Sequence, residues 1–217
     1  SKWLAFATMF GGVRLWDVKA RTEVTNLRAT DDGSVGPLGV AFSPDSRTLA
    51  YNENDSGAIL LWDIASRSVV GRLTGHESAV TAFAFSPDGQ TLASGSADRT
   101  ASLWNLAQGR QGLQFTNHDG GFGRVAFSPD GRTLALSAAG GAGGVIRLVD
   151  VETGKQKPEL RGHLADISSL AFTSDGQTLL SASDDGTIRV WDLVPRAKAK
   201  PGHEFARNSI SETWRSY

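Results

Sequence analysis

The chain has 217 residues, of which 40% are hydrophobic and 21% are charged, and this composition favours one folded domain with a buried core over a disordered segment. The formal net charge of −1 and the absence of cysteine argue against a strongly basic nucleic-acid protein and exclude a disulfide framework or thiolate metal sites. No apolar run approaches the roughly 18 residues of a membrane span.

The first residues, Ser1-Lys2-Trp3, lack the basic region and apolar run of a secretory leader. Together with the absence of cysteine, this favours a cytoplasmic location. The chain begins without Met, so the sequence is also compatible with a segment cut from a larger multidomain chain.

Two short motifs recur along the chain. The stretch Ala84–Gly89 reads Ala-Phe-Ser-Pro-Asp-Gly, and close relatives of it begin at Ala41, Ala126 and Ala171, so that successive Phe positions lie 43, 42 and 45 residues apart. A second motif, Trp-Asp or a variant, closes each unit at Trp16-Asp17, Trp62-Asp63, Trp104-Asn105, Val149-Asp150 and Trp191-Asp192. Self-similarity at this period indicates a repeat architecture.

Each unit reads as a series of short strands. Val80–Phe85 is apolar on both faces and predicts a buried strand, and the Pro-Asp-Gly that follows predicts a reversal of the chain. Next come a strand at Thr91–Ser96, a tight turn at Asp98-Arg99 and a further strand, for which Ile188–Trp191 is the alternating example. A short outer strand such as Val69–Leu73 precedes the next Gly-His. Four short strands in about 43 residues are typical of a β-propeller blade.

Gly-His, Ser-Pro-Asp-Gly and Trp-Asp, in this order over nearly the whole chain, resemble the WD-repeat family. The resemblance implies an all-β fold, a β-propeller of four-stranded antiparallel blades. It also implies that a His, a strand Ser, a turn Asp and the Trp form a buried hydrogen-bond network in each blade. Two sets match in full: His76, Ser94, Asp98 and Trp104; His163, Ser181, Asp185 and Trp191.

Two units depart from that pattern. One keeps His118 and Ser137 but has Val149 in place of Trp, and another has Asp55 and Trp62 without a His. Because a buried indole or imidazole needs partners, we expect these blades to be looser.

The spacing fits about five blades, one of them split between the two termini. Trp191 and Trp214 are 23 residues apart, as are Trp62 and Phe85, so residues 201–217 are predicted to close a blade whose second half is 3–18. The other blades are expected at 24–64, 69–106, 113–151 and 157–193. Two alternatives stay open: a segment of a longer propeller, or self-association in which two chains complete each other's rings.

Reactive chemistry is largely missing from the sequence. The histidines recur at the repeat period, which indicates structural roles rather than a catalytic set, so we predict no enzyme activity. The Gly-rich run 138–144 lacks the Lys-Ser/Thr of a phosphate loop, and Asp31-Asp32 lacks the alternating ligands of a calcium loop. We therefore expect no metal and no cofactor. The basic cluster of Arg196, Lys198 and Lys200 reads as a linker, and no nucleic acid partner is expected.

The favoured function is a non-catalytic scaffold that binds a protein or peptide through loops at the narrow end of the propeller. The alternatives are a regulatory or sensor segment of a larger protein, and a propeller enzyme with a site at the mouth of the channel. The candidate contacts are acidic, polar and aromatic residues in turns, suited to a basic or mixed peptide: Phe10, Asn54, Glu77, Asp119, Phe122, Asp166 and Asp184.

Overall fold

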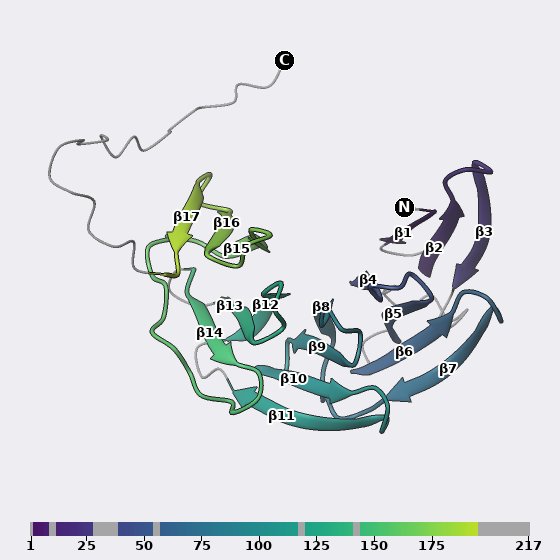
Figure 1. Ribbon diagram of the computed structural model, residues 1–217, viewed down its shortest axis with the longest axis horizontal. Helices are drawn as coiled ribbons and strands as arrows, with labels where there is room; N and C mark the ends of the chain where they lie inside the picture. Colours follow the sequence, from purple (N-terminus) through teal and green to yellow (C-terminus); the bar gives the residue numbers. More distant parts are fainter. Residues whose placement is uncertain are drawn as a thin grey trace, which may run out of the picture.

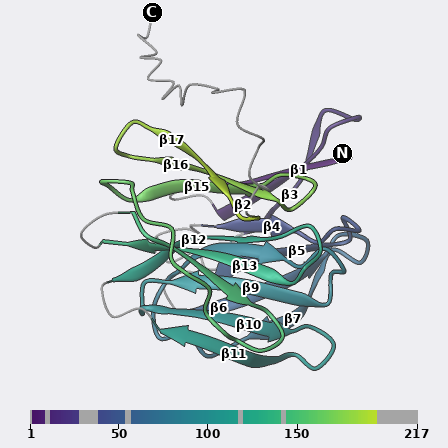
Figure 2. The same cartoon turned by 60° about the vertical axis from the view of Figure 1, so that its left-hand side comes forward.

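The computed structural model describes residues 2–8, 12–27, 39–53, 57–116, 120–140 and 144–194, and in this part of the chain all regular structure is β. Five antiparallel sheets follow one another along an arc (Figure 1). The turned view of Figure 2 shows the sheets lying over one another as layers. The fold class predicted from the sequence is confirmed.

The sheets are numbered here in chain order. The first contains β1 (Trp3–Thr8), β2 (Gly12–Asp17) and β3 (Thr22–Leu27). The second contains β4 (Val40–Phe42), β5 (Thr48–Glu53), β6 (Ala58–Asp63) and β7 (Ser68–Leu73). The third contains β8 (Val80–Phe85), β9 (Thr91–Ser96), β10 (Thr100–Asn105) and β11 (Arg110–Thr116). The fourth contains β12 (Gly121–Phe127), β13 (Thr133–Ala139) and β14 (Ile146–Asp150), and the fifth contains β15 (Ile167–Phe172), β16 (Thr178–Ser183) and β17 (Ile188–Asp192).

The Ser-Pro-Asp-Gly motif forms the predicted turn. Gly89 has φ +70° and donates its N–H to the carbonyl of Ser86, a left-handed conformation that glycine adopts without steric penalty. The Ser86 hydroxyl donates to the Asp88 carboxylate, and this hydrogen bond lowers the pKa of Asp88 below its usual value. The motif therefore joins the first two strands of a blade by side-chain as well as backbone bonds.

The predicted blade boundaries were wrong by one strand. After Asp63 a short turn, closed by the Ser66 N–H on the Asp63 carboxylate, returns the chain along the strand it has just left, so β7 pairs with β6. The second and third sheets accordingly span residues 40–73 and 80–116, where the sequence had suggested 24–64 and 69–106. The first sheet likewise extends to Leu27, beyond the predicted 3–18. The predicted closing segment 201–217 lies outside the described residues.

Neighbouring sheets pack through two different faces. The forward face of a sheet, turned to the next sheet in the chain, carries small and branched side chains; in the third sheet these are Ala93, Ala101 and Leu103. The backward face, turned to the preceding sheet, carries larger ones, such as Leu134, Leu136 and Val149 in the fourth. Each described core cluster joins a forward face to a backward face.

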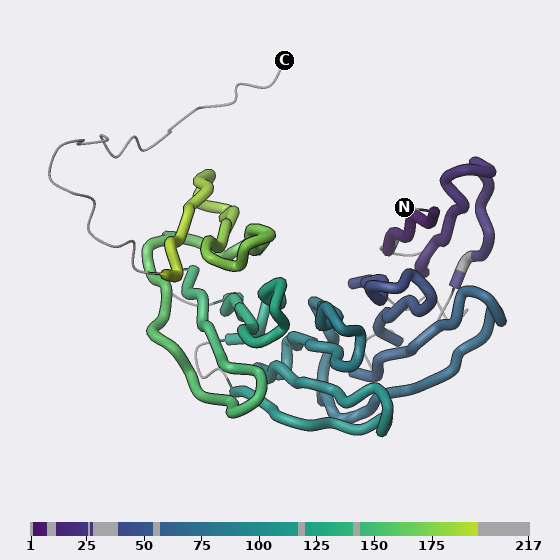
Figure 3. Tube along the Cα trace, viewed as in Figure 1, coloured from purple at the N-terminus to yellow at the C-terminus, as the bar shows by residue number. Residues whose placement is uncertain are grey.

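The described sheets form an open arc, with the first and fifth sheets at its two ends (Figure 3). The end faces are exposed where their internal counterparts are buried: Ile188 on the forward face of the fifth sheet is 74% exposed, and Leu4 on the backward face of the first is 54% exposed. Within the described ranges no helix has the length and hydropathy needed to cross a membrane.

Candidate functional site

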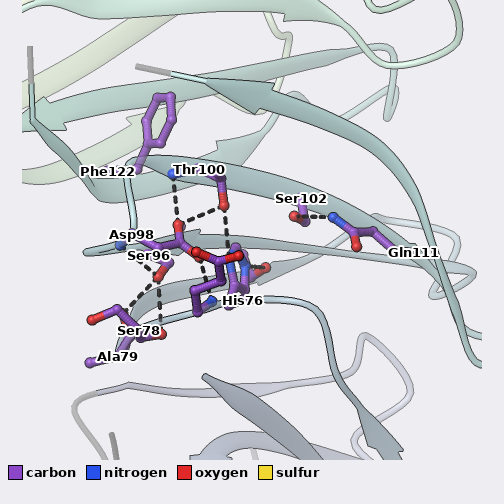
Figure 4. Close-up of polar contacts among 12 residues, drawn as sticks. His76, Ser78, Ala79, Ser96, Asp98, Thr100, Ser102, Gln111 and Phe122 are labelled. Atoms are coloured by element: carbon purple, nitrogen blue, oxygen red, sulfur yellow. Dashed lines mark hydrogen bonds and ion pairs between the residues drawn. The ribbon is translucent and has the colours of Figure 1, made fainter. Parts of the chain in front are cut away.

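The structure brings the four predicted residues of the third sheet into one chain of hydrogen bonds. Trp104 Nε1 donates to Ser94 Oγ at 2.7 Å, Ser94 Oγ lies 2.7 Å from His76 Nε2, and His76 Nδ1 lies 2.9 Å from Asp98 Oδ2. Ser94 and His76 reach one another because β9 places Ser94 on the backward face, beneath the turn that carries His76. Figure 4 shows His76 beside Asp98, with Thr100 bonded to the same carboxylate.

The hydrogen bonds fix the protonation of His76. Because Ser94 Oγ accepts from the indole, its own hydroxyl proton is free to donate to Nε2, and Nδ1–H then donates to Asp98. Burial lowers the pKa of His76 below its ordinary value, more than the hydrogen bond and charge of Asp98 raise it. Burial raises the pKa of Asp98, but hydrogen bonds from Thr100 and the backbone N–H of Glu77 outweigh it and leave the pKa lowered. A neutral imidazole therefore faces a carboxylate.

The fifth sheet repeats the arrangement with nearly the same geometry. His163 Nε2 lies 2.7 Å from Ser181 Oγ and its Nδ1 lies 2.9 Å from Asp185 Oδ2, while Trp191 Nε1 donates to Ser181 at 2.8 Å. The imidazole and indole rings meet edge to face in both sheets, with centroids 5.7 and 6.2 Å apart. Burial raises the pKa of Asp185, but hydrogen bonds led by that from Thr187 hold it well below its usual value.

This Ser–His–Asp order matches that of a hydrolase triad, but the serine is in the wrong place for a nucleophile. Ser94 has no exposed surface and its oxygen already accepts the indole proton; Ser181 is 2% exposed and engaged in the same way. A nucleophile needs access to substrate and a nearby oxyanion site. The arrangement can orient a turn and satisfy buried polar groups, and both copies do so.

Sequence reasoning missed two members of each network. Thr100 and Thr187 donate their hydroxyls to the turn carboxylates, and Ser96 and Ser183 bond the backbone of the preceding turn. The signal was present in the sequence, because Ser-x-Ser-x-Asp-x-Thr occurs in both units with the same spacing.

The networks reach the surface at one end of each sheet, along the direction of its strands. This surface, here called the rim, is formed by the turn before each inner strand and the turn between the second and third strands. Asp98 accepts the N–H of Glu77, and Asp185 accepts the N–H of Leu164, at 2.9 Å each. The two kinds of turn are tied together where Asp184 donates its N–H to the carbonyl of Asp166. The buried imidazoles thereby fix the positions of exposed rim residues.

The predicted contact residues differ in their exposure. Glu77 and Asp184 are exposed on the rim. Asp166 is half-buried, and its carboxylate accepts the N–H of Gly140 from the fourth sheet. The assignment of Phe122 to the surface was wrong: it is 1% exposed and packs in the core between the third and fourth sheets. Its side chain extends from β12 toward the third sheet, which covers it. Phe10, Asn54 and Asp119 lie outside the described residues.

The units without a full network replace polar groups by apolar ones. Leu136 and Val149 stand in the fourth sheet where the third has Ser94 and Trp104, and both are fully buried. In the fourth sheet hydrocarbon contacts occupy the place of the polar groups, and the expectation that such units pack more loosely stays a prediction. Ser137 follows Leu136 in β13, so its side chain lies on the forward face of the sheet, where its hydroxyl accepts the N–H of Arg124.

In the first two sheets Phe6 and Tyr51 occupy the serine position. The indole N–H groups of Trp16 and Trp62 find no hydrogen-bond acceptor within the described residues. His118 and Asp55 lie outside those residues. Over the described part of the chain, no three acidic, histidine or cysteine side chains gather in a way that could hold a metal ion.

Comparison with known sequences agrees with the repeat pattern. Residues 67–105, 109–150 and 154–192 match the family described as "WD domain, G-beta repeat". Transducin beta-like protein 3 of Rattus norvegicus is 37% identical over 98 residues, covering 44% of this chain and 12% of that protein. Transcription factor unc-37 of Caenorhabditis elegans is 36% identical over 99 residues, covering 46% of this chain and 16% of that protein.

A longer but weaker match extends beyond these repeats. Autophagy-related protein 16 of Arabidopsis thaliana is 29% identical over 192 residues, which cover 85% of this chain and 36% of that protein. The chain thus spans only about an eighth to a third of the length of these relatives.

Proposed function

Since its repeats place it there, this chain belongs to the WD domain, G-beta repeat family, and we propose that it is a non-catalytic binding platform for a protein or peptide. One of the matched relatives is named a transcription factor, which is a regulatory role. The observation that carries the proposal is the connection from buried imidazole to exposed turn: His76 orients Asp98, and Asp98 holds the backbone of Glu77.

A rim held in this way is suited to recognition. Turn residues that are ordered before binding lose little conformational entropy when a partner arrives, so more of the contact energy appears as affinity. Glu77 and Leu164 occupy equivalent positions in the third and fifth sheets, and Leu164 is 85% exposed. With the exposed carboxylate of Asp184 they present acidic and apolar groups, which fit a peptide carrying basic and apolar side chains.

The burial of the networks favours binding over catalysis. The two serine–histidine–aspartate sets are enclosed, and each serine has its hydrogen-bonding capacity committed to an indole and an imidazole. A catalytic reading would require one such set to be open to solvent. Both described sets instead stabilise their own sheet and its rim turn.

The proposal is tested by charge reversal at the rim. The intact chain is used to select from a peptide library of mixed basic and apolar composition, and binding of the selected peptides is measured for Glu77→Lys and Asp184→Lys. Each substitution is expected to weaken binding about tenfold or more. Asp166 is avoided because its carboxylate also holds Gly140.

Glu152→Lys provides the matched control. Glu152 is exposed in the turn after β14, at the end of the sheet opposite to the rim, where Val151 bonds the carbonyl of Arg132. It should bind every selected peptide as the unaltered chain does. If the two rim variants retain full affinity for all of them, the rim is not the binding surface.

A further inference from the structure

The four strands β4, β8, β12 and β15 lie on the inside of the arc (Figure 1) and contain one charged residue between them. That residue is Arg124 of β12; the other positions of these strands are apolar, glycine, serine or threonine. Arg124 is exposed, and the third and fifth sheets on either side of it are both described. Its exposure therefore does not come from the absence of a neighbouring sheet.

The guanidinium of Arg124 is held across the junction between two inner strands. Nε donates to the carbonyl of Ser168 on β15 at 2.7 Å, and Nη1 donates to the carbonyl of Gly123 at 2.8 Å. Both acceptors are neutral. Among the described residues, no carboxylate pairs with this guanidinium and its remaining N–H donors have no acceptor. The cation thus has a fixed position and donors left for a further group.

The preceding junction shows that a cation is not needed to join two inner strands. There Thr81 of β8 donates its hydroxyl to the carbonyl of Phe122 on β12. Ala82 lies opposite Gly95, in the register position that Arg124 holds opposite Ser137, and is 8% exposed. Because a hydroxyl and a methyl group complete that junction, the charge of Arg124 exceeds what packing and backbone bonding require.

The chemistry of an unpaired guanidinium favours an oxyanion as its ligand. Its planar set of N–H donors matches the oxygens of a carboxylate or a phosphate, and it is always charged in proteins. The four inner strands supply no acidic side chain to satisfy it and no second cation. β12 begins at the rim with Gly121, so Arg124 lies about 10 Å along the strand from the rim, at roughly 3.3 Å per residue.

We propose that Arg124 binds an acidic group, a carboxylate or a phosphate, on a partner peptide that passes from the rim to the inside of the arc. This inference rests on the proposed function, because it gives the same peptide an acidic anchor in addition to its basic and apolar side chains. Contact between Arg124 and the acidic group is itself testable without any peptide, so the two proposals can fail separately.

The first test observes the Nε–H group of each arginine by nuclear magnetic resonance in the intact chain, with the Arg124 signal assigned by its loss in Arg124→Lys. The probes are N-acetylglutamate, N-acetylphosphoserine and, as the neutral control, N-acetylglutamine, added at constant ionic strength. The Arg124 signal is expected to shift saturably with both anions. Arg72 and Arg147 are matched controls, since their Nε groups already donate to the carboxylates of Glu53 and Glu159.

The anion that saturates at the lower concentration identifies the preferred acidic group. The proposal is overturned if the Arg124 signal shifts no more than those of Arg72 and Arg147, or if N-acetylglutamine shifts it as much as the anions do. A purely structural Arg124, which only ties β12 to β15, would give that result.

The second test uses peptides of mixed basic and apolar composition that differ only in having Glu, phosphoserine or Gln at one position. The unaltered chain is expected to bind the preferred acidic form about tenfold or more tightly than the Gln form, and Arg124→Gln should abolish this preference. Arg110→Gln, at the end of the sheets opposite to the rim, should keep it. If no peptide binds but the Arg124 signal shifts saturably, the rim proposal fails and the anion site stands; if peptides bind with equal affinity in all three forms, the acidic anchor is overturned and the rim proposal stands.

Discussion

The third and fifth sheets have the same polar network in different surroundings. Their serine–histidine and histidine–aspartate distances are identical, at 2.7 and 2.9 Å. Their forward faces differ sharply: Leu103 is 5% exposed, whereas Val190, at the equivalent position in β17, is 65% exposed. The hydrogen bonds thus depend on one sheet and its own turn, while burial of the apolar side chains depends on the next sheet.

The largest expected difference between the two sheets lies in their forward faces. Leu103→Ala should lower the free energy of unfolding by about 2–5 kcal/mol, because it opens a cavity between two packed sheets. Val190→Ala should change it by less than about 0.5 kcal/mol, because the side chain is already in contact with solvent. Urea unfolding of the two variants measures both. Equal losses would show that the face of β17 is covered in solution.

The networks should respond alike in the two sheets. Asp98→Ala and Asp185→Ala should each lower the free energy of unfolding by about 1–3 kcal/mol, because each leaves the N–H of a buried imidazole without its acceptor. The comparison is made by thermal and urea unfolding of both variants. A loss confined to Asp98 would mean that the network needs the cover of a following sheet.

Acid should weaken the third sheet through His76. Its pKa is lowered in the folded chain, so below the ordinary value of 6.5 the unfolded chain binds the proton first, and stability falls as the pH falls toward the folded pKa. Between about pH 7.5 and about pH 5.5 the free energy of unfolding should therefore decrease. In His76→Gln the decrease should be smaller over the same range. An unchanged slope in that variant would remove His76 as its source.

The smallest effects on stability are expected at the rim. Glu77→Lys and Asp184→Lys replace exposed side chains and should leave the free energy of unfolding within about 0.5 kcal/mol of the unaltered chain. Differential scanning calorimetry would detect a larger change. This result would allow a loss of peptide binding in these variants to be attributed to the rim itself.

Much of the fold was predictable because it depends on local chemistry. Ser-Pro-Asp-Gly marks a turn, and the strands Val80–Phe85 and Thr91–Ser96 were predicted with the bounds that the structure gives them. The members of both networks were expected from the resemblance to the WD-repeat family, and each Ser was chosen by its equal spacing from the turn Asp. Thr100 and Ser96 were overlooked although they recur with the same spacing, because Ser and Thr are common in strands and turns.

The remaining features depend on contacts distant in sequence. Whether β7 joins the sheet before it or after it is decided by pairing with β6, which the period of the repeat leaves open. Phe122 is buried because the third sheet covers it. The Asp166 carboxylate accepts a hydrogen bond from the N–H of Gly140, which is 26 residues away in the sequence. Exposure of a turn-flanking residue is set by these neighbours, so the contact residues were harder to predict than the networks.

The joining of a forward face to a backward face has an evolutionary consequence. Since every described junction has the same polarity, a duplication or loss of one whole repeat would leave the chemistry of the surviving junctions unchanged. Unequal recombination can therefore alter the number of units without a compensating mutation at each boundary. The number of repeats can therefore change in evolution independently of the packing between neighbouring sheets.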